Sequence, residues 1–428
     1  MTEDQHTIEE LRRLDIEPPS GPSRLDLRNV IAEGRRRRRL HRTRLAGGAA
    51  MALLAVAVAV PAALRQVGSE PDRSAAPGTA APSSELSPTA GASMNIPDEP
   101  TECTAKRLPV PGGVTMSLIT AGDPTGRFLA GRSYPKGHQG SYPVVIWENE
   151  KPRVVSMPGD DQRLTDINSR GVAVGSGYSG GKELPYVYRD GRVNPLGGVS
   201  SGGPTAINES DRIVGTREEN GRQRPVVWPA PDQPARDLPL PGRDWDGRAT
   251  GVDDDGTVVG VVDKVDGDSD AAGSREAVGY LWPADGGPAR QLPMPTVPGG
   301  QATGLAPLSI RNGWIVAVAS RREDTAIAFH AVRYNLAKGE YVPFTGRAAV
   351  SVGNGRGWGA GRSWGGPQGR SDGAALLTDT GTVKLPDLAG LTGGEFVDVR
   401  ALSDDGRIVG GQFDGPDGKP QAIVWHCR

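Results

Sequence analysis

The sequence predicts an all-β protein assembled from repeated units, and three recurring patterns support this prediction. The first is a segment of the form apolar–Asn/Asp–x–x–Gly–x–apolar–Val–Gly. Clear copies lie at Asp166–Gly175, Ala206–Gly215, Gly251–Gly260 and Ala401–Gly410. Weaker copies lie at Gly122–Gly131, Leu308–Val318 and Val350–Gly361. Self-similarity at this spacing indicates an array of equivalent supersecondary units.

Each copy has the pattern of a β-hairpin, because Asn/Asp–x–x–Gly supplies a tight turn with a left-handed glycine. The second pattern is a run that ends in an aromatic residue and follows the hairpin. These runs end at Trp147, Tyr188, Trp228, Trp282, Tyr334 and Trp425, whereas Ala374–Leu377 lacks the aromatic residue. We expect the four tryptophans of this position to lie in the core between units.

The third pattern is an apolar–Pro pair that follows the aromatic run. It occurs at Met157–Pro158, Leu238–Pro239, Leu292–Pro293, Val342–Pro343 and Leu385–Pro386, and in weaker form at Asn194–Pro195. Proline is tolerated in a sheet at an edge, so this fourth strand is predicted to be the outermost. Four short strands per unit, separated by Gly- and Pro-rich turns, are typical of a β-propeller.

The two ends of the repeat region indicate how the ring closes. The last unit stops at Arg428 after three strands, while Cys103–Gly113 carries a Leu–Pro pair and belongs to no earlier unit. We therefore expect the N-terminal strand to complete the last blade. Seven units of about 47 residues fit residues 102–428, near the length of four-stranded blades. The departures in the fifth and sixth units leave six or eight blades as alternatives.

The only two cysteines, Cys103 and Cys427, fall on neighbouring strands of this shared blade. A disulfide between them is the prediction, and two free thiols are the alternative. A bond across so long a loop would stabilise the fold by roughly 5 kcal/mol as an upper figure in the chain-entropy model. Such a bond fits an oxidising, exported location.

An uncharged apolar run at residues 45–64 is long enough to span a bilayer. Seven arginines and no acid lie in Gly34–Arg44, so the positive-inside rule places residues 1–44 in the cytoplasm. A single transmembrane helix is predicted, with a cleaved signal peptide as the alternative. Residues 65–100 then form an Ala/Pro/Ser-rich stalk, and residues 101–428 form an exported propeller.

Charge limits the partners of these parts. Residues 45–428 carry 38 basic and 43 acidic residues, which argues against nucleic-acid binding by the propeller. The arginine run beside the predicted span indicates contact with anionic lipid. The tail, residues 1–44, has two short helical patterns and is a candidate for binding a cytoplasmic protein.

Two family resemblances follow from these motifs. The Asp–Ile–Asn–x–x–Gly hairpin with its aromatic strand resembles the HAF-type extracellular repeats of bacterial exported proteins, in outline over residues 118–428. This resemblance implies an exported propeller without naming an activity. The segment Ser23–Arg39 followed by an apolar span is similar to membrane proteins that accompany extracytoplasmic-function sigma factors. The zinc-binding His–x3–Cys–x2–Cys motif of many such proteins is absent.

Catalytic and metal-binding patterns are scarce. The five histidines are scattered, and no Ser/His/Asp or metal-ligand spacing is visible, so neither an enzyme nor a cofactor is predicted. The acids Asp253–Asp255 fit a hairpin turn. The acids of Asp266–Asp270 alternate as in a calcium loop, but Ala271 and Ala277 stand where that loop needs glycine and a carboxylate. We expect a solvated acidic loop there.

A candidate binding surface lies in loops that break the repeat. Trp245 and Trp364 fall outside the aromatic position of the units, and Arg243, Asp244 and Asp246 flank the former. Tryptophan among charges on a loop is typical of ligand and partner contacts, with local capping of the ring as the alternative. The predicted function is recognition of an envelope glycan or protein. Transmembrane signalling to a cytoplasmic partner such as a sigma factor is the second hypothesis, and an envelope hydrolase is the third.

Overall fold

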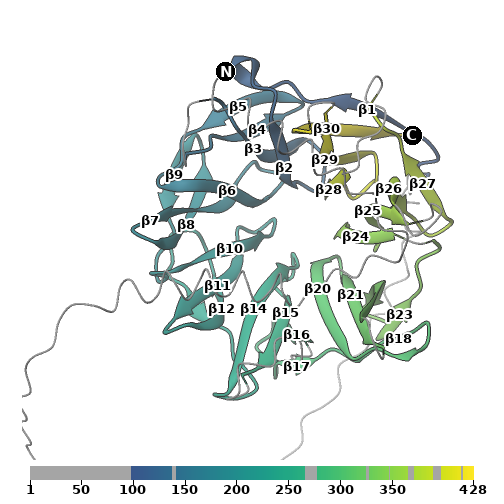
Figure 1. Cartoon of the computed structure of the whole chain (residues 1–428). Coiled ribbons are helices and arrows are strands. Elements are labelled where there is room, and N and C mark those ends of the chain that lie inside the picture. The colour runs from purple at the N-terminus through teal and green to yellow at the C-terminus, as the bar shows by residue number, and fades with distance from the viewer. Residues whose placement is uncertain are drawn as a thin grey trace, which may run out of the picture. The chain divides into compact units, whose positions relative to one another are not determined.

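The structure, a computed structural model, describes residues 98–136, 141–265, 277–323, 327–346, 348–364, 371–388, 397–415 and 418–428. Seven four-stranded antiparallel sheets follow one another around a ring (Figure 1). The predicted seven-bladed β-propeller is therefore confirmed. The one helical segment in the described ranges is a 3-10 turn, η1 (Pro111–Gly113).

Blades 1 to 6 follow the chain order, with the first strand of each blade nearest the centre of the ring (Figure 1). Blade 1 contains β2 (Ser117–Gly122), β3 (Phe128–Ser133), β4 (Val144–Glu148) and β5 (Lys151–Val155). Blade 2 contains β6 (Asp160–Ile167), β7 (Ala173–Ser179), β8 (Lys182–Arg189) and β9 (Arg192–Pro195). Blade 3 contains β10 (Gly202–Ile207), β11 (Ile213–Glu219), β12 (Arg222–Trp228) and β13 (Arg236–Asp237).

The second half of the ring begins with a small insertion. Blade 4 contains β14 (Trp245–Val252), β15 (Val258–Lys264), β16 (Val278–Trp282) and β17 (Arg290–Gln291). A hairpin of β18 (Thr296–Val297) and β19 (Gly300–Gln301) follows. Blade 5 contains β20 (Gly304–Arg311), β21 (Trp314–Arg322), β22 (Ile327–Asn335) and β23 (Glu340–Val342). Blade 6 contains β24 (Ala348–Gly353), β25 (Gly359–Trp364), β26 (Ser371–Leu377) and β27 (Thr382–Leu385).

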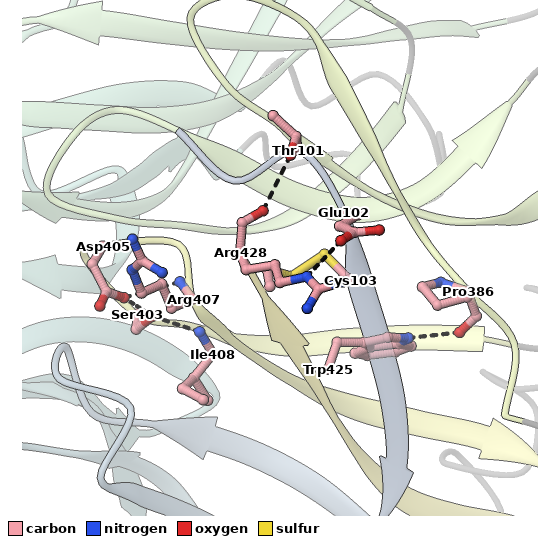
Figure 2. The surroundings of a disulfide bond; sticks show 11 residues. Thr101, Glu102, Cys103, Pro386, Ser403, Asp405, Arg407, Ile408, Trp425 and Arg428 are labelled. Atoms are coloured by element: carbon pink, nitrogen blue, oxygen red, sulfur yellow. Dashed lines mark hydrogen bonds and ion pairs between the residues drawn. A yellow bond between two sulfur atoms is a disulfide. The ribbon is translucent and has the colours of Figure 1, made fainter. Parts of the chain in front are cut away.

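Blade 7 joins the two ends of the propeller, as the sequence predicts. It contains β28 (Val397–Leu402), β29 (Ile408–Asp414) and β30 (Pro420–Cys427), and β1 (Cys103–Arg107) pairs with β30 as its outermost strand. The register places Cys103 opposite Cys427, and the two form a disulfide (Figure 2). Beside it, the Arg428 side chain pairs with Glu102, whose backbone is bonded to that of Arg428. The predicted disulfide is confirmed.

A second contact ties blade 7 to blade 1 beside this closure. Glu150 lies in the turn between β4 and β5 and accepts hydrogen bonds from Lys106 of β1 at 2.5 Å and His426 of β30 at 2.7 Å. Burial opposes ionisation of Glu150, but these two bonds outweigh it and hold the pKa of the carboxyl below its ordinary value. A charged clasp thus adds to the disulfide.

The hydrophobic core divides into seven clusters, one for each interface between neighbouring blades. The cluster that joins blade 7 to blade 1 packs Ala401 and Val424 against Ile119 and Trp147. Because each first strand also faces the centre of the ring, its residues alternate between buried and partly exposed positions. Stability therefore comes from contacts between blades as well as within them.

The four repeat tryptophans are all buried, and each donates its indole N–H to a backbone carbonyl of the preceding blade. The acceptors are Pro109 for Trp147, Gly197 for Trp228, Pro239 for Trp282 and Pro386 for Trp425, all at 2.7–2.8 Å. Figure 2 shows the Trp425 bond. The apolar–Pro pairs mostly lie just beyond the outermost strands and not inside them. Three of those prolines accept these bonds, so the two patterns are halves of one interblade contact.

Each first strand contains a β-bulge, and in four blades the bulged residue carries a hydroxyl that reaches the next blade. Thr165, Thr205, Thr250 and Ser351 donate to the carbonyls of Pro204, Ala249, Pro307 and Val399 at 2.6–2.9 Å. The bulge re-aims its side chain along the ring. The sequence signal for this contact is a Thr or Ser three residues before the turn Asn or Asp.

The turn residues of the repeat also act between blades. Asn168 and Asn208 are fully buried and donate their side-chain amides to the carbonyls of Asn208 and Asp253 in the following blades, at 3.1 and 2.8 Å. Asn354 does the same toward Ser403 at 3.0 Å. These asparagines therefore have two roles. They form the predicted turns, and they also hold the turns of neighbouring blades together.

The fifth unit departs from the repeat for a local reason. Asn312 and Gly313 have positive φ and connect β20 to β21 in a two-residue hairpin, with Arg311 paired to Trp314. The shorter turn moves Asn312 out of the position that Asn208 has in its blade. Instead, Asp253 of blade 4 accepts the backbone N–H groups of Asn312 and Gly313 at 2.8 and 2.7 Å.

The membrane prediction concerns residues 45–64, which lie outside the described residues, as do the tail and nearly all of the stalk. Within the described part of the chain, no helix has the length and apolar character needed to cross a membrane.

Candidate functional site

The two ends of the ring differ in the loops they carry. One end, here called the loop face, carries the connections between blades and those between second and third strands; it includes residues 134–136, 141–143 and 238–246. The opposite end, the turn face, carries the turns between first and second strands and the disulfide. The predicted binding residues all belong to the loop face. Residues 266–276, part of the long predicted loop there, lie outside the described residues.

Trp245 starts β14 and lies half-buried against the core between blades 3 and 4. The neighbouring Asp246 is buried and accepts a hydrogen bond from the Arg222 side chain at 2.5 Å. The same guanidinium donates to the carbonyls of Arg243 and Trp245, each at 3.1 Å. Asp246 thus acts as an anchor between blades 3 and 4. Part of the neighbouring Trp245 side chain remains exposed to solvent.

The other predicted residues are less constrained by neighbours. Asp244 lies 3.5 Å from the Lys264 ammonium in an exposed ion pair, and Arg243 is exposed. The backbone of Trp364 ends β25 in blade 6 at the same face, while its side chain lies outside the described residues. The structure therefore brings Arg243, Asp244, Trp245 and Asp246 together in one connection and places Trp364 two blades away.

A second aromatic group on the loop face is absent from the sequence prediction. The rings of Tyr134 and Tyr142 lie 4.7 Å apart between their centroids, and the Arg132 guanidinium lies 5.0 and 5.5 Å from them. Arg132 also pairs with Asp161 of blade 2 at 2.6 Å. We call Arg132, Tyr134, Tyr142 and Asp161 the tyrosine platform. Burial raises the pKa of Tyr134 above its ordinary value, so its hydroxyl stays protonated at neutral pH.

Hydrogen bonds from the buried side chain of Gln162 hold the tyrosine platform in place. This buried side chain accepts the Tyr142 backbone N–H at 2.9 Å and donates to Ser141 and to the carbonyl of Met157. Its bonds join the connection between β3 and β4 to the connection between blades 1 and 2. Both tyrosines are half-buried, so their remaining surface is presented in a fixed geometry. The sequence signal is Tyr at both ends of the Tyr134–Tyr142 loop.

A charged cluster occupies the turn-face end of the ring's interior. Arg311 of blade 5 lies 3.9 Å from Glu209 of blade 3 and 3.7 Å from Asp404 of blade 7. It therefore spans blades that are not adjacent. Asp166, also near Arg311, accepts the backbone N–H groups of Ile167 and Ile207 at 2.9 and 2.8 Å. Burial raises the pKa of Asp166 to about 6, against partial compensation by these bonds and by Arg311.

These charges have a structural explanation. Glu209 also accepts bonds from the backbone and hydroxyl of Ser169, and Asp404 accepts the Gly355 N–H at 2.8 Å. Each carboxylate thus joins neighbouring turns, and Arg311 offsets their charge. Within the described residues, no group of three or more His, Cys, Asp or Glu side chains is arranged to hold a metal ion.

Comparisons with known proteins support the fold. No protein-family model matches this chain, and no curated protein matches its sequence. Among solved structures, the β-propeller domain of the Trilobed protease from Pyrococcus furiosus, described as having an open velcro topology, is 11% identical. Its TM-score is 0.50, over 72% of this chain and 95% of that chain. Here, by contrast, β1 completes blade 7.

Two peptidases are also similar. An acylaminoacyl peptidase from Pyrococcus horikoshii is 11% identical with a TM-score of 0.47, over 73% of this chain and 52% of that chain. A puromycin-hydrolyzing peptidase from Mycobacterium tuberculosis is 12% identical with a TM-score of 0.47, over 73% of this chain and 51% of that chain. This chain spans about half the length of these two enzymes. At 11% identity, the similarity to the Pyrococcus furiosus propeller domain shows the fold alone. The resemblance to HAF-type repeats and to sigma-factor-associated proteins stays a prediction.

Proposed function

We propose that this protein is a membrane-anchored, extracytoplasmic recognition module, and that its loop face binds a glycan of the cell envelope. The tyrosine platform carries the proposal. Two partly exposed aromatic rings lie beside a guanidinium and a carboxylate. Aromatic rings stack on the apolar face of a sugar ring, and the charged groups hydrogen-bond its hydroxyls.

The contrast between the two ends of the ring supports the choice of face. On the turn face, the Asn, Asp and Glu side chains of the repeat bond to neighbouring turns. On the loop face, Tyr134, Tyr142, Trp245 and Tyr178 keep part of their rings exposed. Arg243, Asp244 and the exposed part of Trp245 extend the proposed surface toward blades 3 and 4, and Trp364 adds to it from blade 6.

The anchoring belongs to the same proposal. The apolar run at 45–64 would hold the propeller at the membrane, with residues 1–44 inside and the arginine run against anionic lipid. The 36-residue stalk that follows would give the loop face reach from the bilayer surface.

Binding of the full chain, purified in detergent, to an array of bacterial envelope polysaccharides and peptidoglycan fragments tests this function. We expect retention of at least one glycan class, weakened about tenfold or more by Tyr142→Ala and by Trp245→Ala. Phe329→Ala, which removes an exposed ring from blade 5, is the matched control and should bind like the wild type. If Tyr142→Ala bound the glycan as tightly as the wild type, the tyrosine platform would not be the binding site. If the wild type retained no glycan, the proposed function would be wrong.

A further inference from the structure

Blade 5 leaves two thirds of its third strand, β22, without a paired outer strand in the described part of the chain. The outermost strand β23 is three residues long and pairs with Arg333–Asn335 of β22. In the described part of the chain, no strand pairs with Ile327–Val332 on that side, whereas β21 pairs with all of β22 on the other. A six-residue sheet edge is therefore open at the loop-face end of blade 5.

The corresponding edges of blades 1, 2 and 3 are covered or protected. In blade 1, β5 pairs with the whole of β4. In blades 2 and 3 the uncovered segments are Lys182–Pro185 and Arg222–Pro225, and both combine charges with a proline. Charges and proline on an edge strand prevent pairing with another chain. The segment Ile327–Val332, Ile–Ala–Phe–His–Ala–Val, contains neither Lys, Arg, Asp, Glu nor Pro.

The direction of the free backbone groups follows from the repeat. In blades 2, 3 and 4, the carbonyl of the residue three positions before the aromatic accepts a bond from the chain after the outermost strand: Pro185 from Leu196, Pro225 from Leu238 and Gly279 from Leu292. The equivalent residue in blade 5 is Ala331, three before Tyr334. Its backbone groups thus point outward, as do those of Phe329 and Ile327 by the two-residue period of a strand.

The side chains of this edge are unusually exposed for apolar residues. Phe329 is 69% exposed and Ile327 is 48% exposed, and they share one face of the sheet. Farther along this face, Ala331 packs with Val350 and Leu377 of blade 6. The exposed pair therefore extends the apolar contact between blades 5 and 6 into solvent.

We propose that the edge Ile327–Val332 binds an extended peptide segment of a partner protein, which adds to blade 5 as a strand beside β22. The free N–H and C=O groups of Ile327, Phe329 and Ala331 would pair with the peptide backbone. Side chains of the peptide on the face of Ile327 and Phe329 lie within contact distance of them and are therefore apolar, at alternate positions. This site is separate from the tyrosine platform and does not depend on glycan binding.

The size and charge of the edge select this occupant. A stable interface between two folded proteins needs about 800 Å² per partner, far more than six edge residues provide, so a second propeller is not favoured here. An edge without Lys, Arg, Asp or Glu offers no ion-pair partner to a charged peptide side chain, which favours a neutral peptide core.

An array of nine-residue peptides that alternate threonine with valine, isoleucine, leucine or phenylalanine is the probe, incubated with the full chain in detergent. We expect binding that falls at least tenfold in the double variant Ile327→Lys plus Phe329→Lys. Ala331→Pro keeps both apolar side chains but removes an outward N–H, and it should weaken binding by a similar factor. Tyr142→Ala, a change in the tyrosine platform, is the control and should bind these peptides like the wild type.

Hydrogen exchange separates strand addition from simple adhesion to Phe329. On binding the best peptide of the array, the amides of Phe329 and Ala331 should become protected. Peptide binding without protection of these amides would overturn the proposal, and so would no binding to the wild type. Self-association of the wild type that Phe329→Lys abolishes would identify a second copy as the occupant and would also overturn it.

Discussion

Single side chains of the repeat make the contacts that hold one blade to the next. The tryptophan indoles and the bulge hydroxyls all donate to backbone carbonyls of a neighbouring blade. A buried carbonyl that loses its donor keeps its desolvation cost, so these bonds are expensive to delete. The aromatic and Thr positions are therefore explained by the fold, whereas Tyr134 and Tyr142 are not.

Trp228 tests the role of the indole bond. Trp228→Phe keeps an aromatic ring but removes the donor to the Gly197 carbonyl, so we expect a loss of about 1–3 kcal/mol in the free energy of unfolding. Trp228→Ala should cost about 3–5 kcal/mol, because it also leaves a cavity. Urea unfolding of the purified chain measures both.

The control for this prediction is Trp245→Phe. The Trp245 indole bonds to no group in the described residues, so its replacement should cost under about 1 kcal/mol. A Trp228→Phe variant as stable as Trp245→Phe would contradict the proposed importance of the interblade bond.

The raised pKa of Asp166 should make the stability of the fold depend on pH. Its folded-state pKa of about 6 lies above its ordinary value of 3.8, so the folded state binds the proton more tightly than the unfolded state between these values. Stability should therefore fall as pH rises from about 4 to about 6, and this contribution is constant outside that window. Urea midpoints measured from pH 4 to pH 7 should show a shallower fall in Asp166→Asn. If the urea midpoint of Asp166→Asn fell with pH as steeply as that of the wild type, the protonation of Asp166 would not be the cause of the fall.

Strands and blades form the next scale, where blade 7 differs from the rest. Its outermost strand comes from the other end of the propeller, so its pairing with β30 closes the ring, and the disulfide and the Glu150 clasp both lie at this junction. The pairing with β1 covers the outer edge of β30, which would otherwise be open. Blade 5 differs in the described strands, because β22 extends six residues beyond its pairing with β23 and this segment lacks the charges and proline of the uncovered segments in blades 2 and 3.

Reduction of the disulfide should weaken this junction. The bond joins residues 324 apart in sequence, and its loss should lower the free energy of unfolding by up to roughly 5 kcal/mol. Urea unfolding with and without reductant measures the effect, and hydrogen exchange should rise first in β1. The double variant Cys103→Ser plus Cys427→Ser is the control, because it should show no response to reductant. Equal stability of the wild type in both conditions would mean that the other blade-7 contacts suffice.

The whole molecule is arranged, in our proposal, as a short tail, a membrane span, a stalk and a ring. A fusion of alkaline phosphatase to the C-terminus should be active in a bacterial host, because that enzyme needs the oxidising exported compartment. The same reporter fused to the N-terminus should be inactive. Activity of the N-terminal fusion would reverse the topology, and release of the C-terminal product from membranes would indicate a cleaved signal peptide.

Much of the fold follows from local chemistry that the sequence displays. The glycine of each Asn/Asp–x–x–Gly turn marks a hairpin, and the aromatic and proline positions mark the strands that follow. The two cysteines and the unfinished last unit predict the closure in blade 7, because the repeat pattern assigns the strands that carry Cys103 and Cys427 to the same blade. The fifth unit fits the repeat pattern less well, because its Asn312–Gly313 turn is a two-residue hairpin.

The sequence by itself determined the repeat, the strands, the blade closure and the disulfide, because each depends on turn conformation or on position along the chain. Only the tertiary structure decided what a side chain meets in the next blade. It assigned Asp246 to an anchor with Arg222, joined Tyr134 and Tyr142 around Arg132, and left Phe329 exposed on an open edge. Such contacts join residues from different strands and loops, and the spacing of a pattern along the chain does not encode them.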